Sequence, residues 1–433
     1  QINIRMFRPM ESYQKYGGVL TFARSVGYAV VKKPEGYTTA KVDQIIQEYE
    51  KKSANEQQST AKQYPNIITV VNETFADIKV LGDFKTNEDY MPYFHSLKKN
   101  CVTGYTYASI VGGQTANTEF ELLTGNTLGF LSAGTTAFQL YIHGQMPSLV
   151  SNLKAEGYSG NKAMHPFNPY NYNRPAVYKD FGFTDFIDKF DFPKNVKRVR
   201  EYISDEANVD RIISEYEKNR KKTDQPFYMY NMTIQNHSPY DKDAANFKQP
   251  IKIESSKYDA EANRYLNLIK YSDDSLKQLT GYFEKCKEPT IILFLGDHQP
   301  RLTDEFMNKI TNGQYQTWNS EQMMKRYQVP FVIWANYDIK EQHIEKTSMN
   351  YIQSILAKTA GVKMTGYQRF LNEVRKEVPT ITSQGYWGKN GKFYQINDKG
   401  SPYYGIIQKY RMIQYNMMFD KKNRRDSFFE VSK

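Results

Sequence analysis

Two short apolar runs constrain the fold of this chain more than any other feature of its sequence. The first, residues 65–72, is followed by Glu73, and the second, residues 290–296, is followed by Asp297 and His298. Continuous β-branched and aliphatic runs of this length predict strands buried on both faces, as in a parallel sheet covered by helices. Function in such sheets collects just beyond the carboxyl ends of the strands. The three polar residues are therefore candidates for a site.

Other segments extend this prediction to an α/β fold with a mostly parallel central sheet flanked by helices. Residues 227–234 read as a third core strand, and residues 329–334 as a fourth despite Pro330. Residues 194–222 and 258–287 have amphipathic helical spacing. After about residue 380, short aromatic segments alternate with Gly, Asn and Asp turns, which predicts hairpins of a small C-terminal antiparallel sheet.

The length of 433 residues allows one large α/β domain and a smaller appendage. We expect residues 1–63 to hold a basic, irregular start and a helix that Thr39 caps. The main domain is expected over residues 64–375, and the small subdomain over residues 376–433.

The composition and net charge limit the classes of function that this chain can have. The formal net charge of +11 indicates an affinity for anions, such as a phosphate-rich polymer or an anionic membrane surface, and no motif points to nucleic acid. Cys101 and Cys286 lack zinc-site spacing and are predicted to be unpaired. The nearest approach to a membrane helix, residues 19–31, is interrupted by Arg24 and falls short of the roughly 18 apolar residues needed.

Asp297 and His298 follow the second run, and adjacent carboxylate and imidazole groups suit Mn²⁺ or Zn²⁺. The alternative is a turn begun by the aspartate, with an incidental histidine. Glu73 alone could be a helix first-turn residue that interacts with the helix dipole. Its pairing with the similar strand-end position of Asp297 favours a metal site.

Thr115 lies where a Gly112-Gly113 turn opens into a helical pattern. A threonine here could simply cap a helix that continues through Thr118 and Glu119. The same position also binds phosphate, because free N–H groups and the helix dipole converge there. A hydroxyl held by a metal in that field is a competent nucleophile. Spacing alone leaves both interpretations open.

Two polar loops supply further candidates. His165, Tyr172, Asn173 and Arg174 come from a loop rich in Asn, Pro and Tyr, and His237 follows the third strand. Arg174 could clamp a phosphate with two hydrogen bonds, or be an exposed loop arginine. His237 could hold a phosphate oxygen or pass a proton to a leaving oxygen, or bond only to its own loop.

Taken together, five motifs in order resemble the lipoteichoic acid synthase family, a sulfatase-like branch of the alkaline phosphatase superfamily. The resemblance covers about residues 64 to 300, and within the family it is most similar to the branch of streptococcal glycerol-phosphate transferases that decorate wall polysaccharides. The motifs are Asn72–Phe75, Gly113–Phe120, His165–Pro166 with Asn173–Arg174, Gln235–Tyr240 and Gly296–Pro300.

The resemblance implies a role for each matching position. It assigns Mn²⁺, with Mg²⁺ or Zn²⁺ as alternatives, to Glu73, Thr115, Asp297 and His298, and it makes Thr115 the nucleophile. It assigns the glycerol phosphate to Arg174 and His237. We expect His165, Tyr172 and Asn173 to line the substrate site as well, because their loop is of the kind that lines sites. Three positions depart from the family pattern: Tyr172 stands where some members carry Trp, Phe167 where some carry an acidic residue, and Gln114 where this branch commonly has glycine. The first two departures concern substrate identity more than metal chemistry.

The implied activity is transfer of glycerol phosphate from phosphatidylglycerol, through a phospho-threonine, to a lipoteichoic acid chain or a wall polysaccharide. The implied setting is the membrane of a Gram-positive cell, with this chain as the extracellular domain and its juxtamembrane segment. A phosphoethanolamine transferase, phosphatase or sulfatase is a second interpretation. A non-catalytic, basic module that binds wall polymers is a third.

Overall fold

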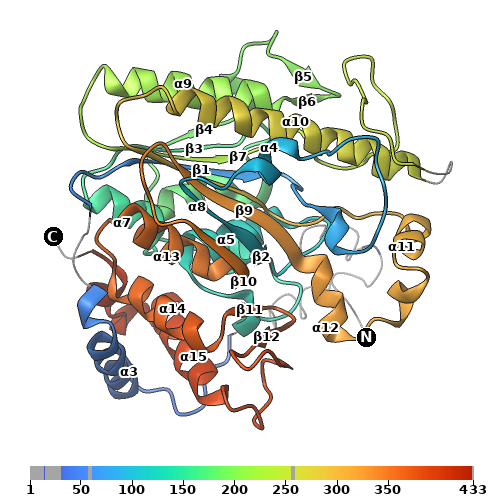
Figure 1. Cartoon of the computed structure of the whole chain (residues 1–433). Helices are drawn as coiled ribbons and strands as arrows, with labels where there is room; N and C mark the ends of the chain where they lie inside the picture. The colour runs from blue at the N-terminus through green and yellow to red at the C-terminus, as the bar shows by residue number, and fades with distance from the viewer. Residues whose placement is uncertain (1–13, 15–30, 57–60, 255–258, 432–433) are drawn as a thin grey trace.

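The computed structural model describes residue 14 and residues 31–56, 61–254 and 259–431. Within them, an eight-stranded sheet forms the centre of the molecule (Figure 1). Its strands, in spatial order, are β10 (Gln342–Ser348), β2 (Cys101–Tyr107), β9 (Gln328–Ala335), β8 (Thr290–Gly296), β1 (Asn66–Asn72), β7 (Phe227–Met232), β3 (Ser159–Met164) and β4 (Asp185–Ile187).

All strands of this sheet run in one direction except β9, which is antiparallel to both of its neighbours. The expected proline lies near the start of β9. Pro330 is opposite Tyr105 of β2, whereas the pairing with β8 begins at Phe331. The proline is therefore accommodated beyond the end of the β8 ladder, and the prediction of a strand here is confirmed.

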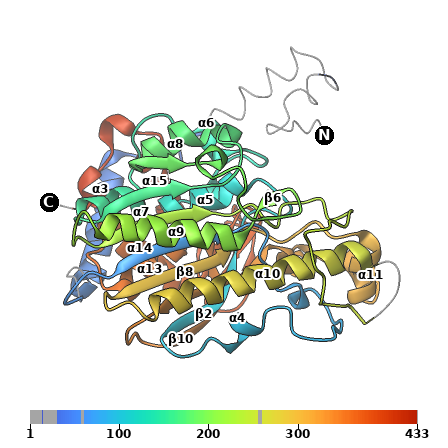
Figure 2. The same cartoon turned by 90° about the horizontal axis from the view of Figure 1, so that it is seen from above.

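Helices cover both faces of the sheet, as expected for an α/β fold. On one face α9 (Asp205–Arg220) and α10 (Ala260–Phe283) lie side by side, and on the other lie α5 (Thr115–Thr124) and α13 (Met349–Ala360) (Figures 1 and 2). The strands β1, β7 and β8 are buried along their whole length, which is why their sequences are continuously apolar. The remaining α-helices are α4 (Pro92–Ser96), α6 (Ala137–Leu140), α7 (Leu149–Ala155), α8 (Arg174–Phe181), α11 (Asp304–Ile310) and α12 (Ser320–Met323), with those of the two ends given below.

Two predicted helices begin elsewhere than expected. Helix α3 (Thr39–Lys52) is capped by Thr38, whose hydroxyl accepts a hydrogen bond from Lys41 N at 3.0 Å, so the cap lies one residue before Thr39. Helix α9 begins only at Asp205, after the cap residue Ser204. Residues 198–203 form instead the short hairpin of β5 (Arg198–Val199) and β6 (Tyr202–Ile203).

The predicted small antiparallel sheet is present and consists of β11 (Thr380–Thr382), β12 (Gly385–Trp387) and β13 (Phe393–Tyr394). The hairpin pattern does not continue to the C-terminus. Helices α15 (Tyr404–Met418) and α16 (Asp426–Phe429) follow, which the sequence analysis did not predict.

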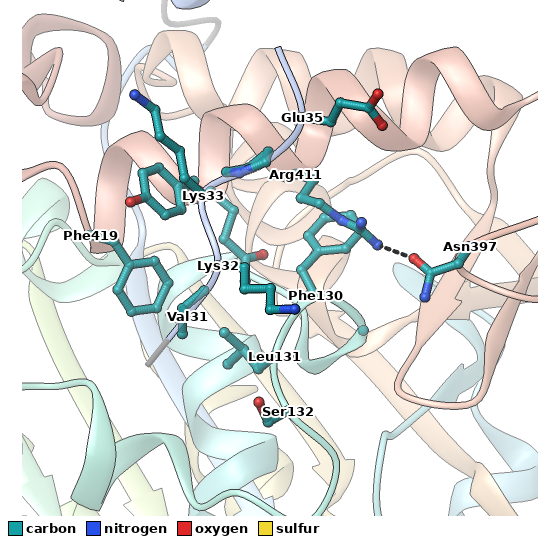
Figure 3. A pocket seen from close by; sticks show the side chains of 14 residues that line it. Val31, Lys32, Lys33, Glu35, Phe130, Leu131, Ser132, Asn397, Arg411 and Phe419 are labelled. Atoms are coloured by element: carbon teal, nitrogen blue, oxygen red, sulfur yellow. Dashed lines mark hydrogen bonds between the residues drawn. The ribbon is translucent and has the colours of Figure 1, made fainter. Parts of the chain in front are cut away.

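The two ends of the described chain meet. Helix α3, in blue, packs against α14 (Gly366–Glu377) and α15, in red (Figure 1). Residues 31–35 pass alongside α15 and help to enclose a cavity of about 400 Å³, in which Arg411 donates a hydrogen bond to Asn397 at 2.8 Å (Figure 3).

Two further expectations concern cysteines and membrane helices. Cys101 and Cys286 are both free thiols, as predicted. None of the helices among the described residues is long and apolar enough to cross a membrane. Apart from residue 14, the basic N-terminal segment up to residue 30, with most of the window 19–31, lies outside the described residues.

Candidate active site

The ends of β1 and β8 bring the first site residues together. Asn72 is paired with Gly296 at the carboxyl ends of these neighbouring parallel strands, so Glu73 and Asp297 follow at the same edge. A Cβ atom on Gly296 would lie 1.8 Å from the carbonyl oxygen of Phe75. Glycine is therefore required for the chain after β1 to pass this close to β8.

Glu73, Asp297 and His298 form a buried cluster whose candidate ligand atoms all lie within 4.8 Å of one another. His298 Nδ1 lies 2.9 Å from the Gln299 carbonyl oxygen, an acceptor that requires the proton to be on Nδ1. The other ring nitrogen, Nε2, is buried without a hydrogen bond from any described residue, 3.2 Å from Asp297 Oδ2 and 3.9 Å from Glu73 Oε1. An unprotonated imidazole nitrogen facing two carboxylates is suited to binding a cation.

The protonation of Glu73 leads to the same conclusion. Burial, together with the neighbouring Asp297 carboxylate, raises the pKa of Glu73 to about 8. A divalent cation between the carboxylates would offset both effects, because it adds positive charge where desolvation and repulsion disfavour the anion. The donor set of two carboxylates, one imidazole and a hydroxyl fits Mn²⁺, and Mg²⁺ or Zn²⁺ accept subsets of it.

Thr115 is the first residue of α5 and lies beside this cluster. Gly112, Gly113 and Gln114 precede it with positive φ angles, a turn that sets the direction in which the helix starts. Thr115 Oγ1 donates a hydrogen bond to Asp297 Oδ2 at 2.8 Å, and Thr118 Oγ1 donates to the Asp297 carbonyl at 2.8 Å. The Thr115 hydroxyl thus points at the cluster and does not cap α5, whose N-cap residue is Gln114.

Arg174 does not have all of its hydrogen-bond donors available for a phosphate, because Glu119 accepts hydrogen bonds from two of its nitrogens. The guanidinium is buried, and its Nε and Nη2 donate to Glu119 Oε1 at 3.1 and 2.7 Å. Tyr178 and Tyr230 donate to the other oxygen of Glu119. The Glu119 carboxylate raises the pKa of Arg174 above its ordinary value despite burial. Arg174 Nη1 makes a long contact, 3.5 Å, to the Asn171 carbonyl.

Tyr172 and Asn173 form the turn that positions Arg174 at the start of α8. Both have positive φ, 61° and 58°, and α8 begins directly after them. The Tyr172 ring lies under the Arg174 guanidinium, with 5.1 Å from Cζ to the ring centroid. Tyr172 is buried and Asn173 is exposed, so the two neighbours face different surroundings.

The two predicted histidines differ in environment. His165 is buried with Nδ1 3.0 Å from the Met232 carbonyl, and burial beside the Arg174 charge holds its pKa well below the ordinary value. His237 is half-buried, with Nδ1 2.7 Å from the Ser238 carbonyl. Phe167 stacks on the His237 ring at 6.0 Å between centroids. The imidazole of His237 is therefore held in a fixed orientation at the surface of the site.

Sequence reasoning missed two residues that hold the site together. Glu119 lies one helical turn after Thr115, and its carboxylate joins α5 to Arg174. Thr74, with φ 54°, donates its N–H to Asp297 Oδ1 at 2.7 Å and its hydroxyl to Glu73 Oε1 at 2.8 Å. Both lie inside recognised motifs, but only their partners across the fold reveal their roles.

A family model described as Sulfatase matches residues 65–362, which includes all of these positions. The chain belongs to the sulfatase family. The match confirms the predicted family relationship, and its range contains the strands and helices that carry the site.

Two curated relatives are similar to this chain. A Rhizobium meliloti protein named for the modification of cyclic beta-1,2-glucan is 30% identical over 433 residues, covering 98% of this chain and 65% of that protein. The lipoteichoic acid synthase-like protein YvgJ of Bacillus subtilis is 27% identical over 240 residues, covering 54% of this chain and 36% of that protein. The chain thus spans less than two thirds of the length of these relatives.

Solved structures confirm the fold. The phosphoglycerol transferase GacH of Streptococcus pyogenes, in complex with sn-glycerol-1-phosphate, superposes with a TM-score of 0.73 at 20% identity, covering 93% of this chain and 100% of that one. An alkaline phosphatase superfamily protein of Vibrio parahaemolyticus gives a TM-score of 0.63 at 16% identity, covering 90% and 98%. The sulfatase family member described here therefore has an alkaline-phosphatase-like fold, as predicted.

Proposed function

We propose that this chain is the catalytic part of a metal-dependent phosphoglycerol transferase. It moves glycerol phosphate from phosphatidylglycerol to a hydroxyl group of a cell-envelope polymer, through an intermediate on Thr115. The observation that carries the proposal is the Thr115 hydroxyl, at the amino end of α5, hydrogen-bonded to Asp297 inside the buried cluster. That arrangement combines a nucleophile, a cation site and a helix terminus suited to phosphate.

Four residues would hold the metal: Glu73, Thr115, Asp297 and His298. We propose Mn²⁺, with Mg²⁺ and Zn²⁺ as alternatives. When bound, the ion supplies Lewis acidity that lowers the pKa of the threonine hydroxyl and neutralises charge on the phosphoryl oxygens.

In the first step, Thr115 Oγ1 forms a bond to phosphorus while the bond from phosphorus to the diacylglycerol oxygen breaks. Asp297 Oδ2, 2.8 Å from Oγ1, accepts the hydroxyl proton. His237 protonates the leaving diacylglycerol oxygen through Nε2, because its Nδ1 is directed at the Ser238 carbonyl. In the second step, His237 takes the proton of the acceptor hydroxyl, which attacks phosphorus, and Thr115 regains its proton.

Substrate binding is shared among the remaining residues. Arg174 faces the phosphate with its Nη1 edge alone, since Glu119 holds Nε and Nη2. This is a smaller role than a two-bond clamp, but the rigid pair offers a fixed positive charge that needs no rearrangement during the reaction. His165, Tyr172 and Asn173 line the glycerol side of the site.

The acceptor is a cell-envelope polymer, and the names of the relatives support two classes. One relative is named for lipoteichoic acid synthesis and another for the modification of a cyclic glucan. Lipoteichoic acid, a wall polysaccharide and a glucan all present hydroxyl groups, and the net charge of +11 suits an anionic product. We propose a cell-membrane location with this domain outside, and retain the Gram-positive setting and the boundaries at residues 64 and 376 as predictions.

A phosphatase, sulfatase or phosphoethanolamine transferase is the second candidate, favoured by the family match alone. The segment around Thr115 lacks the Cys/Ser-x-Pro-x-Arg motif expected of a sulfatase. Hydrolysis of a simple soluble ester faster than turnover of phosphatidylglycerol would favour this candidate.

The deciding experiment measures diacylglycerol released from labelled phosphatidylglycerol in micelles, with and without Mn²⁺. We expect metal-dependent release that falls by at least about a thousandfold in Thr115→Ala. The matched control is Thr124→Ala on the same helix, which should retain activity. Among the described residues, the Thr124 hydroxyl bonds within its own turn and the adjoining loop. Wild-type release from Thr115→Ala would overturn the proposed nucleophile.

A further inference from the structure

Two neighbouring loops expose the largest apolar side chains on the described surface. Tyr170 is 78% exposed and Phe190 is 74% exposed. Tyr170 lies in the loop after β3 and Phe190 in the loop after β4, so both stand at the carboxyl edge of the sheet, on the side where the site lies. A hydrogen bond from Lys189 N to the Phe167 carbonyl, 3.4 Å long, joins the two loops. The loops that carry the two aromatics are therefore neighbours at this edge of the sheet.

The exposure of Phe190 is imposed by a rigid turn. Phe190 lies in the short helix η5 (Lys189–Asp191), which Asp188 caps by accepting from Phe190 N at 2.7 Å. Asp191 Oδ2 accepts in return from Asp188 N at 2.9 Å, and Arg211 donates to the Asp191 carbonyl at 2.7 Å. A side chain fixed in water by such a turn gains by contact with an apolar partner.

A cavity of about 450 Å³ lies beside Phe190, and it is also lined by Pro166 and Phe167, which directly follow His165. Its lining is mainly aromatic and apolar, and it includes Phe167 and Tyr202. Both of these side chains contact His237: Phe167 stacks on the ring, and the Tyr202 hydroxyl lies 3.4 Å from Nδ1. Two side chains that line the cavity together with Phe190 thus contact the histidine proposed to protonate the leaving group.

The mouth of this cavity is basic. Three cations line it, Lys189, Lys194 and Arg198, against a single carboxylate, Glu201. Among the described residues, no carboxylate forms an ion pair with any of the three cations. Arg198 Nη1 instead donates to the Glu201 carbonyl at 2.9 Å. Lys189 Nζ lies over the Phe190 ring, 4.9 Å from its centroid. An exposed ring beside cations that form no ion pair with a described carboxylate complements an anionic lipid surface, where rings insert at headgroup level and cations attract phosphate.

We propose that this surface docks on an anionic phospholipid membrane. It consists of Tyr170, Phe190, Lys189, Lys194 and Arg198, and we call it the aromatic rim. The cavity behind the rim receives the apolar part of the lipid, so that the headgroup phosphate extends past His237 to Thr115. The identity of the lipid as the donor rests on the proposed function, whereas attachment of the rim to the membrane does not.

The test measures co-sedimentation of the metal-free protein with vesicles of phosphatidylglycerol and phosphatidylcholine in equal parts. Tyr170→Ser/Phe190→Ser should weaken the apparent Kd by at least about tenfold, since two exposed rings lose their apolar contact. Lys189→Glu/Lys194→Glu should weaken it similarly and remove its salt dependence. Lys221→Glu/Lys222→Glu is the matched control, because these exposed lysines follow α9 at the opposite edge of the sheet.

Equal binding by wild type and the serine variant would overturn the proposal, as would equal losses in both lysine pairs. Binding of wild type, but not of the serine variant, to a soluble β-glucan in place of vesicles would identify a sugar site and overturn it too.

A second measurement separates this inference from the proposed chemistry. The serine variant should turn over a soluble glycerophosphodiester with Mn²⁺ as wild type does, while losing release from vesicles. Failure of all turnover, with vesicle binding intact, would count against the proposed function alone.

Discussion

At the residue scale, the pair of Glu119 and Arg174 decides how the site is held. Both side chains are buried, 0% and 2% exposed, with 2.7 Å between Glu119 Oε1 and Arg174 Nη2. We expect Glu119→Gln to lower the free energy of unfolding by about 3–5 kcal/mol, because it leaves an uncompensated buried charge. Glu206→Gln makes the same change in a surface pair with Lys197, half exposed on both sides, and should cost at most about 1 kcal/mol.

Urea unfolding of the two variants measures both values. Similar costs in Glu119→Gln and Glu206→Gln would show that the buried pair does not carry the stability assigned to it. The same comparison tests the site, since loss of Glu119 should also release Arg174 and raise KM for the donor more than Glu206→Gln does.

The sequence allowed part of this site to be predicted. Glu73, Asp297 and His298 come together as expected because each follows a recognisable buried strand, and adjacent strands share an edge. The same reasoning could not show that Glu119 takes up two donors of Arg174. That contact depends on the packing of α8 against α5, which cannot be predicted from a local sequence pattern.

At the element scale, the crossing of β8 and the segment after β1 depends on one glycine. We expect Gly296→Ala to destabilise the protein by several kcal/mol and to weaken Mn²⁺ binding, because its Cβ would lie 1.8 Å from Phe75 O. Gly281→Ala in α10 is the matched control, since a Cβ there has no atom within 4 Å. It should instead stabilise the helix by roughly 0.5–1 kcal/mol.

Chemical denaturation and Mn²⁺ titration of both variants check this prediction. A Gly296→Ala protein with wild-type stability and metal affinity would mean that β8 can move away from Phe75 without disturbing Asp297. The control guards against a general effect of replacing glycine by alanine in the backbone.

The elements differ in how far the sequence could predict them. β1, β7 and β8 are fully buried, so their composition alone marks them as strands. β3 reads Ser-Gly-Asn-Lys-Ala-Met and is only half buried, so it offers no such pattern. α15 is rich in Tyr and Met, lacks a side-chain cap and follows hairpin turns, which favoured a continued antiparallel unit. In both cases tertiary packing, not local preference, selects the structure.

At the scale of the whole molecule, the contacts of the C-terminal part argue against its independence. Tyr410 donates to the Gly125 carbonyl at the end of α5, at 2.6 Å. Ser383 Oγ donates to the Ser109 carbonyl at 2.8 Å, in the segment that leads from β2 to the Thr115 turn. The region after residue 376 is thus bonded to both ends of the segment that carries the nucleophile.

We therefore expect residues 64–375 and 376–433 to unfold together. The chain has 3 tryptophans, and two of them report on different parts: Trp334 lies in β9 of the central sheet and Trp387 in β12 of the small sheet. Two single-tryptophan variants, with the other positions changed to Phe, should give coincident urea midpoints by fluorescence. An earlier midpoint for Trp387 would instead establish the boundary near residue 376 as a real domain border. Coincidence would mean that the small sheet and α15 are part of the scaffold that positions Thr115, so that cutting the chain at 376 should abolish activity as well as stability.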